Sequence, residues 1–215
     1  MEPIETQLRR LDPGNGAAWS GSLARSLDDA AKRDSLVAAI ASSERFDVYW
    51  NPLIFHTANA LIKSGAMPAP DALVAAIGVG AAQAIPAFQP LTAGCKGPAL
   101  EQQAAALVRC RRLTAVLRHG DTYITEMLGQ SLAKRLWQVG SPEYQEVVDA
   151  RRLTRYRCEA GIKANRDLVS PEGTKRYLEL LATHRTEQEV ALAELTRAGF
   201  APNPGAHWKD RYPES

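Results

Sequence analysis

Apolar residues recur every three or four positions along most of this chain, which is the spacing of one face of an α-helix. The pattern is clearest between Cys95 and Trp137. Pro98 is expected to open a helix, Gly120 to end it, and Asp121 to cap a second helix. The inward positions of the two helices are Leu100, Ala104, Leu107, Cys110, Leu113 and Leu117, then Ile124, Leu128, Leu132, Leu136 and Val139. This stretch therefore predicts a helical hairpin around which the rest of the chain is arranged.

The same period predicts helices through the rest of the chain, each delimited by residues that commonly start or stop helices. Asn15, Asp34 and Ser141 are expected to cap helices, while Gly65 and Gly199 are expected to end them. Further helices are expected over residues 4–11, 50–63, 72–88 and 174–198. No alternating apolar and polar run predicts a strand. The chain is therefore expected to be all-α, with antiparallel helical hairpins stacked into one orthogonal or solenoid-like bundle.

Two prolines, Pro68 and Pro70, mark a joint between two parts of the chain. Residues 1–66 are expected to form an N-terminal domain of tetratricopeptide-like helical hairpins. Residues 67–215 are expected to form a C-terminal helical bundle with an irregular tail that contains proline and tryptophan. The two parts are expected to pack as one unit.

Composition and charge are those of an ordinary globular protein: 215 residues, 45% of them hydrophobic and 23% charged. The net charge of +2 is too small to favour nucleic acid as a partner. Arginines gather in the stretches Arg109–Arg118 and Arg151–Arg157, mostly opposite the apolar stripes, where a solvated helix face is the expected interpretation. No apolar run approaches the roughly 18 residues of a membrane-spanning helix, so no span is predicted.

The three cysteines are compatible with two cellular compartments. A reducing compartment would leave three free thiols, whereas an oxidising one would allow a single bridge with one thiol left over. The start of the chain, Met1-Glu2-Pro3, lacks a secretion signal, which fits a cytoplasmic protein and equally the mature part of an exported one. The spacing Cys95-x14-Cys110 matches no zinc pattern, so no metal site is predicted. Cys158 is expected to be a small packing residue.

Catalytic and phosphate-binding motifs are missing from the sequence, and no cofactor is predicted. The densest aromatic cluster runs from Phe46 through Tyr49 and Trp50 to Phe55, with His56 next to it. Such a cluster can form a slot for a ligand. More often it is a corner of the core where a loop packs against helices.

Two further candidates lie near the end of the chain. His184 and Gln188 share one face of the last expected helix and could hold a ligand or a partner's side chain. A core histidine that bonds a neighbouring carbonyl is the more common structure. Beyond that helix the tail is rich in proline, but Phe200, Trp208 and Tyr212 predict that it folds back on the body.

One short stretch resembles a known repeat. The run Leu11-Asp12-Pro13-x-Asn15-x-Ala17-x-Trp19 is similar to the junction between tetratricopeptide repeats. The resemblance covers residues 8–42 and implies a helical hairpin. It departs from the repeat at Ser22-Leu23 and at Ser35, and no second copy follows at the period of about 34 residues. The stretch is therefore interpreted as a single degenerate hairpin.

A wider resemblance covers most of the chain. The order of its features is similar to that of uncharacterised, often exported helical proteins of Gram-negative bacteria. The features are Asp12-Pro13 with Trp19, Cys95 and Cys110, Gly120-Asp121-Thr122, and Gln188, Leu195, Gly199 and Pro202-x-Pro204 before Trp208. The resemblance implies a periplasmic location, with the cytoplasm as the alternative. It also implies a bridge between Cys95 and Cys110, which leaves Cys158 free.

The leading functional hypothesis is a non-enzymatic helical module that binds another protein, because stacked helical hairpins build concave binding surfaces. An immunity protein that neutralises a toxin would be one form of it. The candidate contact residues are Trp50, Phe55, His56, His184, Gln188 and Trp208. The alternative is a small-ligand binder or enzyme that uses the Phe46–Phe55 corner with His56. A second alternative is nucleic-acid binding through the arginine-rich helices.

Overall fold

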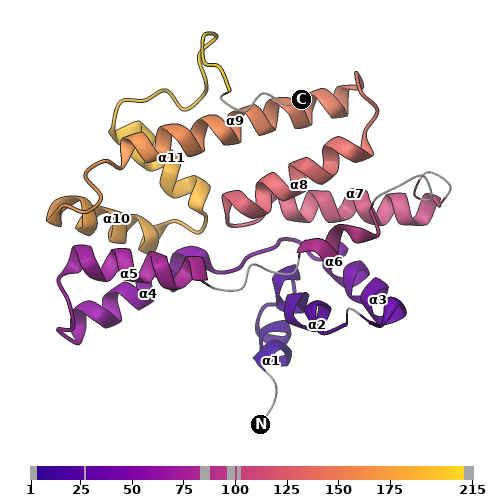
Figure 1. The fold of residues 1–215 in the computed structure, drawn as a ribbon, viewed down its shortest axis with the longest axis horizontal. Helices are drawn as coiled ribbons and strands as arrows, with labels where there is room; N and C mark the ends of the chain where they lie inside the picture. The colour runs from indigo at the N-terminus through magenta and orange to yellow at the C-terminus, as the bar shows by residue number, and fades with distance from the viewer. Residues whose placement is uncertain (1–3, 27, 83–87, 96–99, 101–102, 211–215) are drawn as a thin grey trace. The chain divides into compact units, whose positions relative to one another are not determined.

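Helices make up all of the regular structure that the computed structural model describes, over residues 4–26, 28–82, 88–95, 100 and 103–210 (Figure 1). The helices are α1 Ile4–Leu11, the 3₁₀ helix η1 Gly16–Trp19, α2 Ser20–Ala24, α3 Ala30–Ala41, α4 Trp50–Lys63, α5 Ala69–Ala82, α6 Phe88–Ala93, α7 Ala104–Arg118, α8 Tyr123–Leu136, α9 Pro142–Ala164, α10 Pro171–Thr183 and α11 Glu187–Arg197. The predicted all-α class is therefore confirmed. The expected helix start at Pro98 and the tail residue Tyr212 lie outside the described residues.

Contacts divide the chain into two compact units that interleave along the sequence. The first unit comprises Met1–Val48, Ala84–Gly120 and Ile124–Val148, and the second comprises Tyr49–Gln83, Asp121–Tyr123 and Asp149–Ser215. This grouping differs from the division after residue 66 that the sequence suggested. The reason is that each unit gathers segments far apart in the chain, which a local change of composition does not reveal.

In the first unit, the predicted cap Asn15 is buried and holds two segments together. Its Oδ1 accepts hydrogen bonds from the backbone N–H groups of Ala17 and Asp47, both at 3.0 Å. Its Nδ2 donates to the Asp47 carbonyl at 2.9 Å. The asparagine therefore caps η1 as expected and also fixes the strand-like stretch before α4 through a long-range contact.

The helix α3 begins earlier than expected. Asp29, not Asp34, is its N-cap, and the Asp29 carboxylate accepts from the Lys32 N–H at 2.9 Å. Asp34 lies within the helix, so the prediction of its role as a cap was wrong. Both aspartates precede apolar residues. Only Asp29 directly precedes the first turn of α3, whose N–H groups have no acceptor within the helix.

The predicted hairpin from Cys95 to Trp137 forms α7 and α8, joined by the short stretch 119–122. Most of its apolar positions enter the core of the first unit, including Leu113, Leu117, Leu132 and Leu136, next to Phe46. Two assignments were wrong, because Ile124 is 52% exposed and Val139 is 77% exposed. Ile124 lies in the first turn of α8, and Val139 lies beyond the end of that helix at Leu136.

The cysteines Cys95 and Cys110 lie at disulfide-bonding distance, with their Cα atoms 5.7 Å apart, and both are buried in the first unit's core. Cys158 is the free cysteine among the described residues. The short helix α6, which precedes Cys95, was not predicted. The described part of the expected helix 72–88 ends with α5 at Ala82, and residues 83–87 lie outside the described residues. Leu91 of α6 packs into the same core cluster as Cys110.

We expect one free thiol per chain when oxidised protein is titrated in denaturant without reductant. Cys158→Ser should reduce the count to none. Reduction should lower the free energy of unfolding by about 3 kcal/mol, because the bridge closes a loop of 15 residues. Three free thiols, in protein never exposed to reductant, would contradict the pairing.

In the second unit, α4 and α5 lie side by side and α10 packs against both (Figure 1). Gly80 allows the close approach of α4 and α5. A Cβ atom placed on it would lie 2.6 Å from Ile54 Cδ1 and 2.9 Å from the Trp50 ring. Gly78, two residues earlier in the same helix, has no atom within 4 Å of such a Cβ. Close packing of α4 on α5 therefore requires a glycine at position 80 and does not require one at position 78.

The expected last helix, residues 174–198, is in fact two helices, so this prediction was wrong. α10 begins at Pro171, where the Ser170 hydroxyl accepts from the Gly173 N–H, and it ends at Thr183. α11 starts with a capping box in which Thr186 and Glu189 bond each other's backbone N–H groups. The box stabilises a new helix start and thereby breaks the apolar stripe that suggested a single helix.

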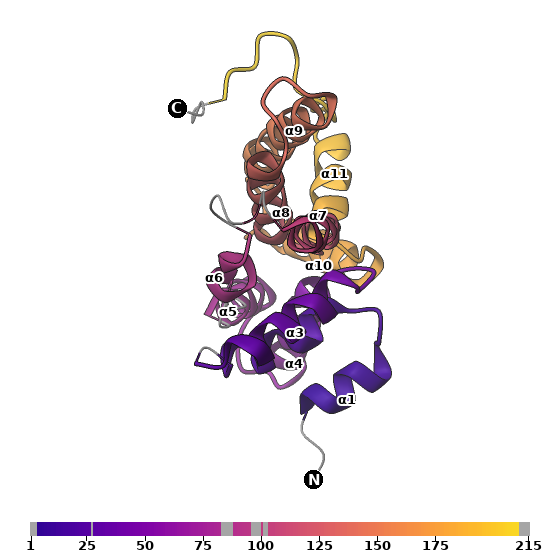
Figure 2. The ribbon, with the colours of Figure 1, turned by 90° about the vertical axis from the view of Figure 1, so that its right-hand side faces the viewer.

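A fully buried carboxylate, Glu194, joins α10 to α11. It pairs with Arg176 Nε at 2.9 Å and with Arg197 Nη2 at 2.8 Å, which offsets the cost of burying its charge. Figures 1 and 2 both show α11 alongside the second half of α9, where Leu195 packs against Ala160 and Ala164. These contacts hold the three helices that surround the pocket described below.

The two glycines of α5 provide a matched stability test. We expect Gly80→Ala to lower the free energy of unfolding by about 1–3 kcal/mol, because the added methyl overpacks the contact with Trp50 and Ile54. Gly78→Ala should raise it by about 1 kcal/mol through helix propensity alone. Urea denaturation of both variants checks the pair. Equal effects of the two substitutions would contradict the close packing of α4 on α5.

Candidate functional site

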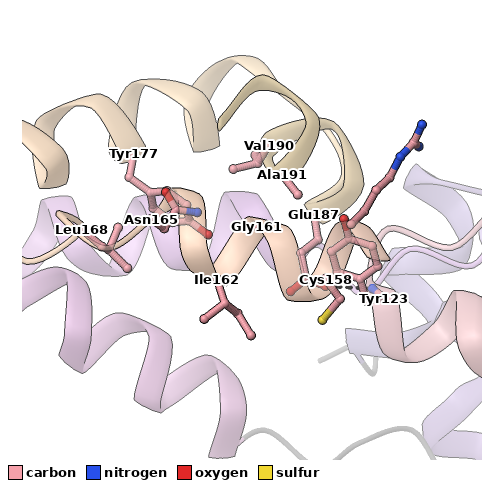
Figure 3. Close-up of a pocket in the computed structure, with 11 residues that line it drawn as sticks. Tyr123, Cys158, Gly161, Ile162, Asn165, Leu168, Tyr177, Glu187, Val190 and Ala191 are labelled. Carbon is pink, nitrogen blue, oxygen red and sulfur yellow. Dashed lines mark hydrogen bonds between the residues drawn. The ribbon is translucent and has the colours of Figure 1, made fainter. Parts of the chain in front are cut away.

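A cavity of about 300 Å³ opens beside α9 within the second unit (Figure 3). We call it the Glu187 pocket. Its walls come from α9, α10, α11, the turn after α9 and the first residue of α8. The lining residues are Tyr123, Arg157, Cys158, Gly161, Ile162, Asn165, Leu168, Tyr177, Glu187, Val190 and Ala191. Apolar atoms predominate, with a few polar groups among them, as is typical of binding pockets.

A small network of hydrogen bonds fixes one end of this pocket. The buried Asp121 accepts from the Trp50 N–H through its carboxylate at 3.0 Å, and from the Glu187 N–H through its carbonyl at 2.8 Å. Glu187 Oε2 in turn accepts from the Tyr123 N–H at 2.8 Å. Trp50, Tyr123 and Glu187 are the first residues of α4, α8 and α11, whose N–H groups lack acceptors in their own helices. The network therefore satisfies three helix starts and orients the Glu187 side chain.

The thiol of Cys158 lies at the same end of the pocket as Tyr123 and Glu187 (Figure 3). Burial raises the pKa of Cys158, and the negative charge of Glu187 raises it further. Because the thiolate is the nucleophilic form, this environment keeps the sulfur unreactive near neutral pH. Cys158 is thus a neutral part of the pocket wall.

At the other end of the pocket lie Asn165, Leu168 and Tyr177 (Figure 3). Burial raises the pKa of Tyr177 to about 12, and the charges of Glu187 and Glu194 contribute. The Asn165 Oδ1 atom is buried and has no hydrogen-bond partner among the described residues. An unsatisfied buried acceptor is costly, so it marks a position where a bound donor would be stabilised.

The residues of the expected aromatic corner pack in two different cores. Phe46 is fully buried in the first unit's core, whereas Trp50 and Phe55 pack in the core of the second unit. Phe55 lines a more open cavity of about 420 Å³ between α4 and α10. His56 is exposed and lies edge-on against Phe55, with ring centroids 5.3 Å apart.

His184 and Gln188 also differ from the pair expected on one helix, because His184 lies between α10 and α11. Its Nδ1 is 3.2 Å from the Leu180 carbonyl oxygen, and its own carbonyl accepts from Asn51 Nδ2 at 3.0 Å. Local backbone groups thus engage the histidine. Gln188 follows Glu187 in α11, but only Glu187 lines the pocket.

The tail packs on α9 as expected, as far as residue 210. The Trp208 ring meets Tyr156 edge-on, with centroids 5.6 Å apart, and Arg152 lies over the same ring. Tyr156 Oη donates to the Ala201 carbonyl at 2.8 Å. Trp208 is therefore part of an intramolecular contact along the helix.

Five of the arginines considered for nucleic-acid binding make contacts within the chain. On α9, Arg152 donates to tail carbonyls, Arg155 pairs with Asp210, and Arg157 Nε donates to the Pro202 carbonyl at 3.0 Å. In the first unit, Arg111 lies over the Trp137 ring and Arg118 pairs with Glu146 at 2.8 Å. These contacts give the arginines structural roles. They favour the solvated or packed face over a phosphate-binding patch.

The residues that form the Glu187 pocket were not among the candidates predicted from the sequence. One signal was present: Thr186-x-x-Glu189 has the spacing of a capping box, which places Glu187 at the first position of a helix. No comparable signal brings Tyr123, Asn165 and Tyr177 together, since they belong to different segments.

No protein-family model, no curated protein and no solved structure matches the chain. Within the described chain, no helix combines the length and apolar character that a bilayer crossing requires. The described residues also contain no group of three or more His, Cys, Asp or Glu side chains placed to hold a metal ion.

The raised pKa of Cys158 predicts a specific pH dependence of alkylation. We expect iodoacetamide to label Cys158 slowly at neutral pH, with a midpoint of the rate profile above that of an exposed thiol. Glu187→Gln should lower this midpoint because it removes a negative charge that opposes the thiolate. The exposed Glu172→Gln, which changes the net charge equally, should leave it unchanged. Mass spectrometry across a pH series measures the rates, and an unchanged midpoint in Glu187→Gln would contradict this electrostatic assignment.

Proposed function

We propose that this protein is a non-enzymatic binding module, and that the Glu187 pocket holds a side chain of a partner protein. The observation that carries the proposal is the form of the pocket: apolar walls, few polar groups and an exposed apolar residue beside it. Ile162 lines the pocket and is 72% exposed, so an apolar side chain meets solvent at the edge of the cavity. Pockets that anchor one side chain are common at the centres of protein interfaces.

The chemistry of the pocket supports recognition over catalysis. A nucleophilic cysteine needs a lowered pKa, whereas burial and Glu187 raise the pKa of Cys158. Tyr177 likewise stays protonated at neutral pH, since its pKa is raised to about 12. Both groups are neutral hydrogen-bonding or packing partners under these conditions.

A small-ligand binder that uses the same pocket is the second candidate. It is favoured by the cavity volume of about 300 Å³, at the lower end of the range for ligand sites, and by the buried acceptor Asn165 Oδ1. The protein partner is preferred because Ile162 lines the pocket and is itself 72% exposed, so apolar surface extends beyond the enclosed part of the cavity. A ligand enclosed by the cavity would leave this surface unused.

The location proposed with this function is an oxidising compartment such as the periplasm. The buried Cys95 and Cys110 lie at disulfide-bonding distance, and a disulfide persists in such a compartment, which supports this location. An immunity protein that holds a toxin's side chain in the Glu187 pocket would be one specific form of the proposal.

The test is a pull-down from extracts of the native organism with the wild-type protein, Ile162→Asp and Val74→Asp. The last is a matched control, because Val74 is a half-exposed apolar residue on α5 that does not line the pocket. Both substitutions lie at exposed positions and should change the free energy of unfolding little. We expect wild type and Val74→Asp to retain the same partner and Ile162→Asp to lose at least about tenfold in affinity.

Equal retention of the partner by Ile162→Asp and wild type would contradict the proposal. Native mass spectrometry distinguishes the small-ligand binder from the protein-binding module. A small molecule that copurifies with wild type and is lost in Ile162→Asp, in place of a protein, would favour the small-ligand binder.

A further inference from the structure

We infer that the side chain held in the Glu187 pocket is a lysine of the partner protein, with its ammonium group beside Glu187 and its aliphatic stem along α9. This inference rests on the proposed function and names the chemistry of the partner's anchor. The pocket offers three matching features: a carboxylate at one end, an apolar wall, and a buried acceptor at the other end.

The charge at the carboxylate end selects for a cation. Glu187 raises the pKa of both Cys158 and Tyr177, so its negative charge acts along the pocket and favours a positive occupant. Tyr123, at the same end as Glu187, presents an aromatic side chain to the cavity, and such rings also attract ammonium groups. The Arg157 guanidinium, which lines the pocket as well, donates from Nε to the Pro202 carbonyl and is thereby held by the tail.

The wall along α9 fits an aliphatic stem. Gly161 has no side chain, and Ile162, Leu168, Val190 and Ala191 supply apolar surface. In Figure 3, the residues Cys158, Gly161 and Asn165 follow one another along α9 between the two ends of the pocket. The helix rises about 10 Å from Cys158 to Asn165. An extended lysine side chain together with its backbone fits a wall of this length.

Two details favour lysine over arginine. Glu187 Oε2 already accepts the Tyr123 N–H at 2.8 Å, so the carboxylate is not presented symmetrically to a planar guanidinium fork. The compact ammonium of lysine needs no such geometry. At the other end, Asn165 Oδ1 can accept a hydrogen bond from the partner's backbone N–H beside that lysine.

The experiment uses Cys158 as a reporter, because it is the free thiol and lines the pocket. Its alkylation by iodoacetamide is measured in the oxidised full chain, with increasing Nα-acetyl-lysine methylamide or its neutral analogue Nα-acetyl-norleucine methylamide. Each variant is compared with itself in the absence of probe, so a change in intrinsic thiol reactivity does not enter the result. The variants are wild type, Glu187→Gln and the matched exposed control Glu172→Gln.

We expect the lysine probe to protect Cys158 in wild type and in Glu172→Gln. In Glu187→Gln the concentration needed for half protection should rise about tenfold, since the charge pair is lost. The norleucine probe should protect more weakly than lysine in wild type and equally in all three proteins.

Two results would overturn the inference: no protection by the lysine probe in wild type, or equal protection by lysine and norleucine that Glu187→Gln leaves unchanged. Neither result refutes the proposed function, because the pull-down with Ile162→Asp tests the pocket independently of the charge on its occupant. Conversely, protection by lysine together with an Ile162→Asp variant that retains its partner would refute the proposed function and, with it, the partner's lysine as the occupant. The preference of the pocket for an ammonium group would remain, and the pocket would be assigned to free alkylammonium ligands.

Discussion

Three helix starts in the second unit depend on one buried residue, Asp121, and on the carboxylate that it positions. The first N–H groups of α4, α8 and α11 have no acceptor within their own helices. Asp121 accepts two of them, and Glu187 accepts the third. The partial positive charge at each helix start also stabilises the two carboxylates. The polar end of the Glu187 pocket is a consequence of this arrangement.

The same arrangement supports the proposed binding of a partner's side chain. A carboxylate held at a fixed position by backbone groups needs no reorganisation when a cation binds, which lowers the cost of ordering the complex. Its charge and the surrounding apolar wall keep Cys158 and Tyr177 protonated. The pocket therefore combines a fixed negative charge at Glu187 with protonated Cys158 and Tyr177, while Arg157, which also lines it, donates to the Pro202 carbonyl of the tail.

Much of the fold followed from local patterns in the sequence. The all-α class, the caps at Asn15 and Ser141, and the helix ends at Gly65 and Gly199 all depend on residues within one turn of each other. The approach of Cys95 to Cys110 was implied by a resemblance that covers most of the chain.

The pocket could not be predicted in the same way. Asp121 was expected to cap α8 locally, but its carboxylate accepts from Trp50, 71 residues away. Phe46 and Trp50 are neighbours in sequence and yet pack in different cores. Buried polar groups find partners through tertiary structure, and the period of apolar residues carries no information about those partners.

Native-state amide hydrogen exchange tests the network at Asp121 most directly. The first amide of a helix normally exchanges quickly, because nothing in its own helix accepts it. The amides of Trp50, Tyr123 and Glu187 are predicted to exchange as slowly as amides in the middle of α10. Asp121→Ala should remove this protection from Trp50, which donates to the Asp121 carboxylate, and not from Glu187, which donates to the Asp121 backbone carbonyl. Exchange of all three in the wild-type protein at the rate of exposed tail amides would contradict the network and the position of Glu187 that follows from it.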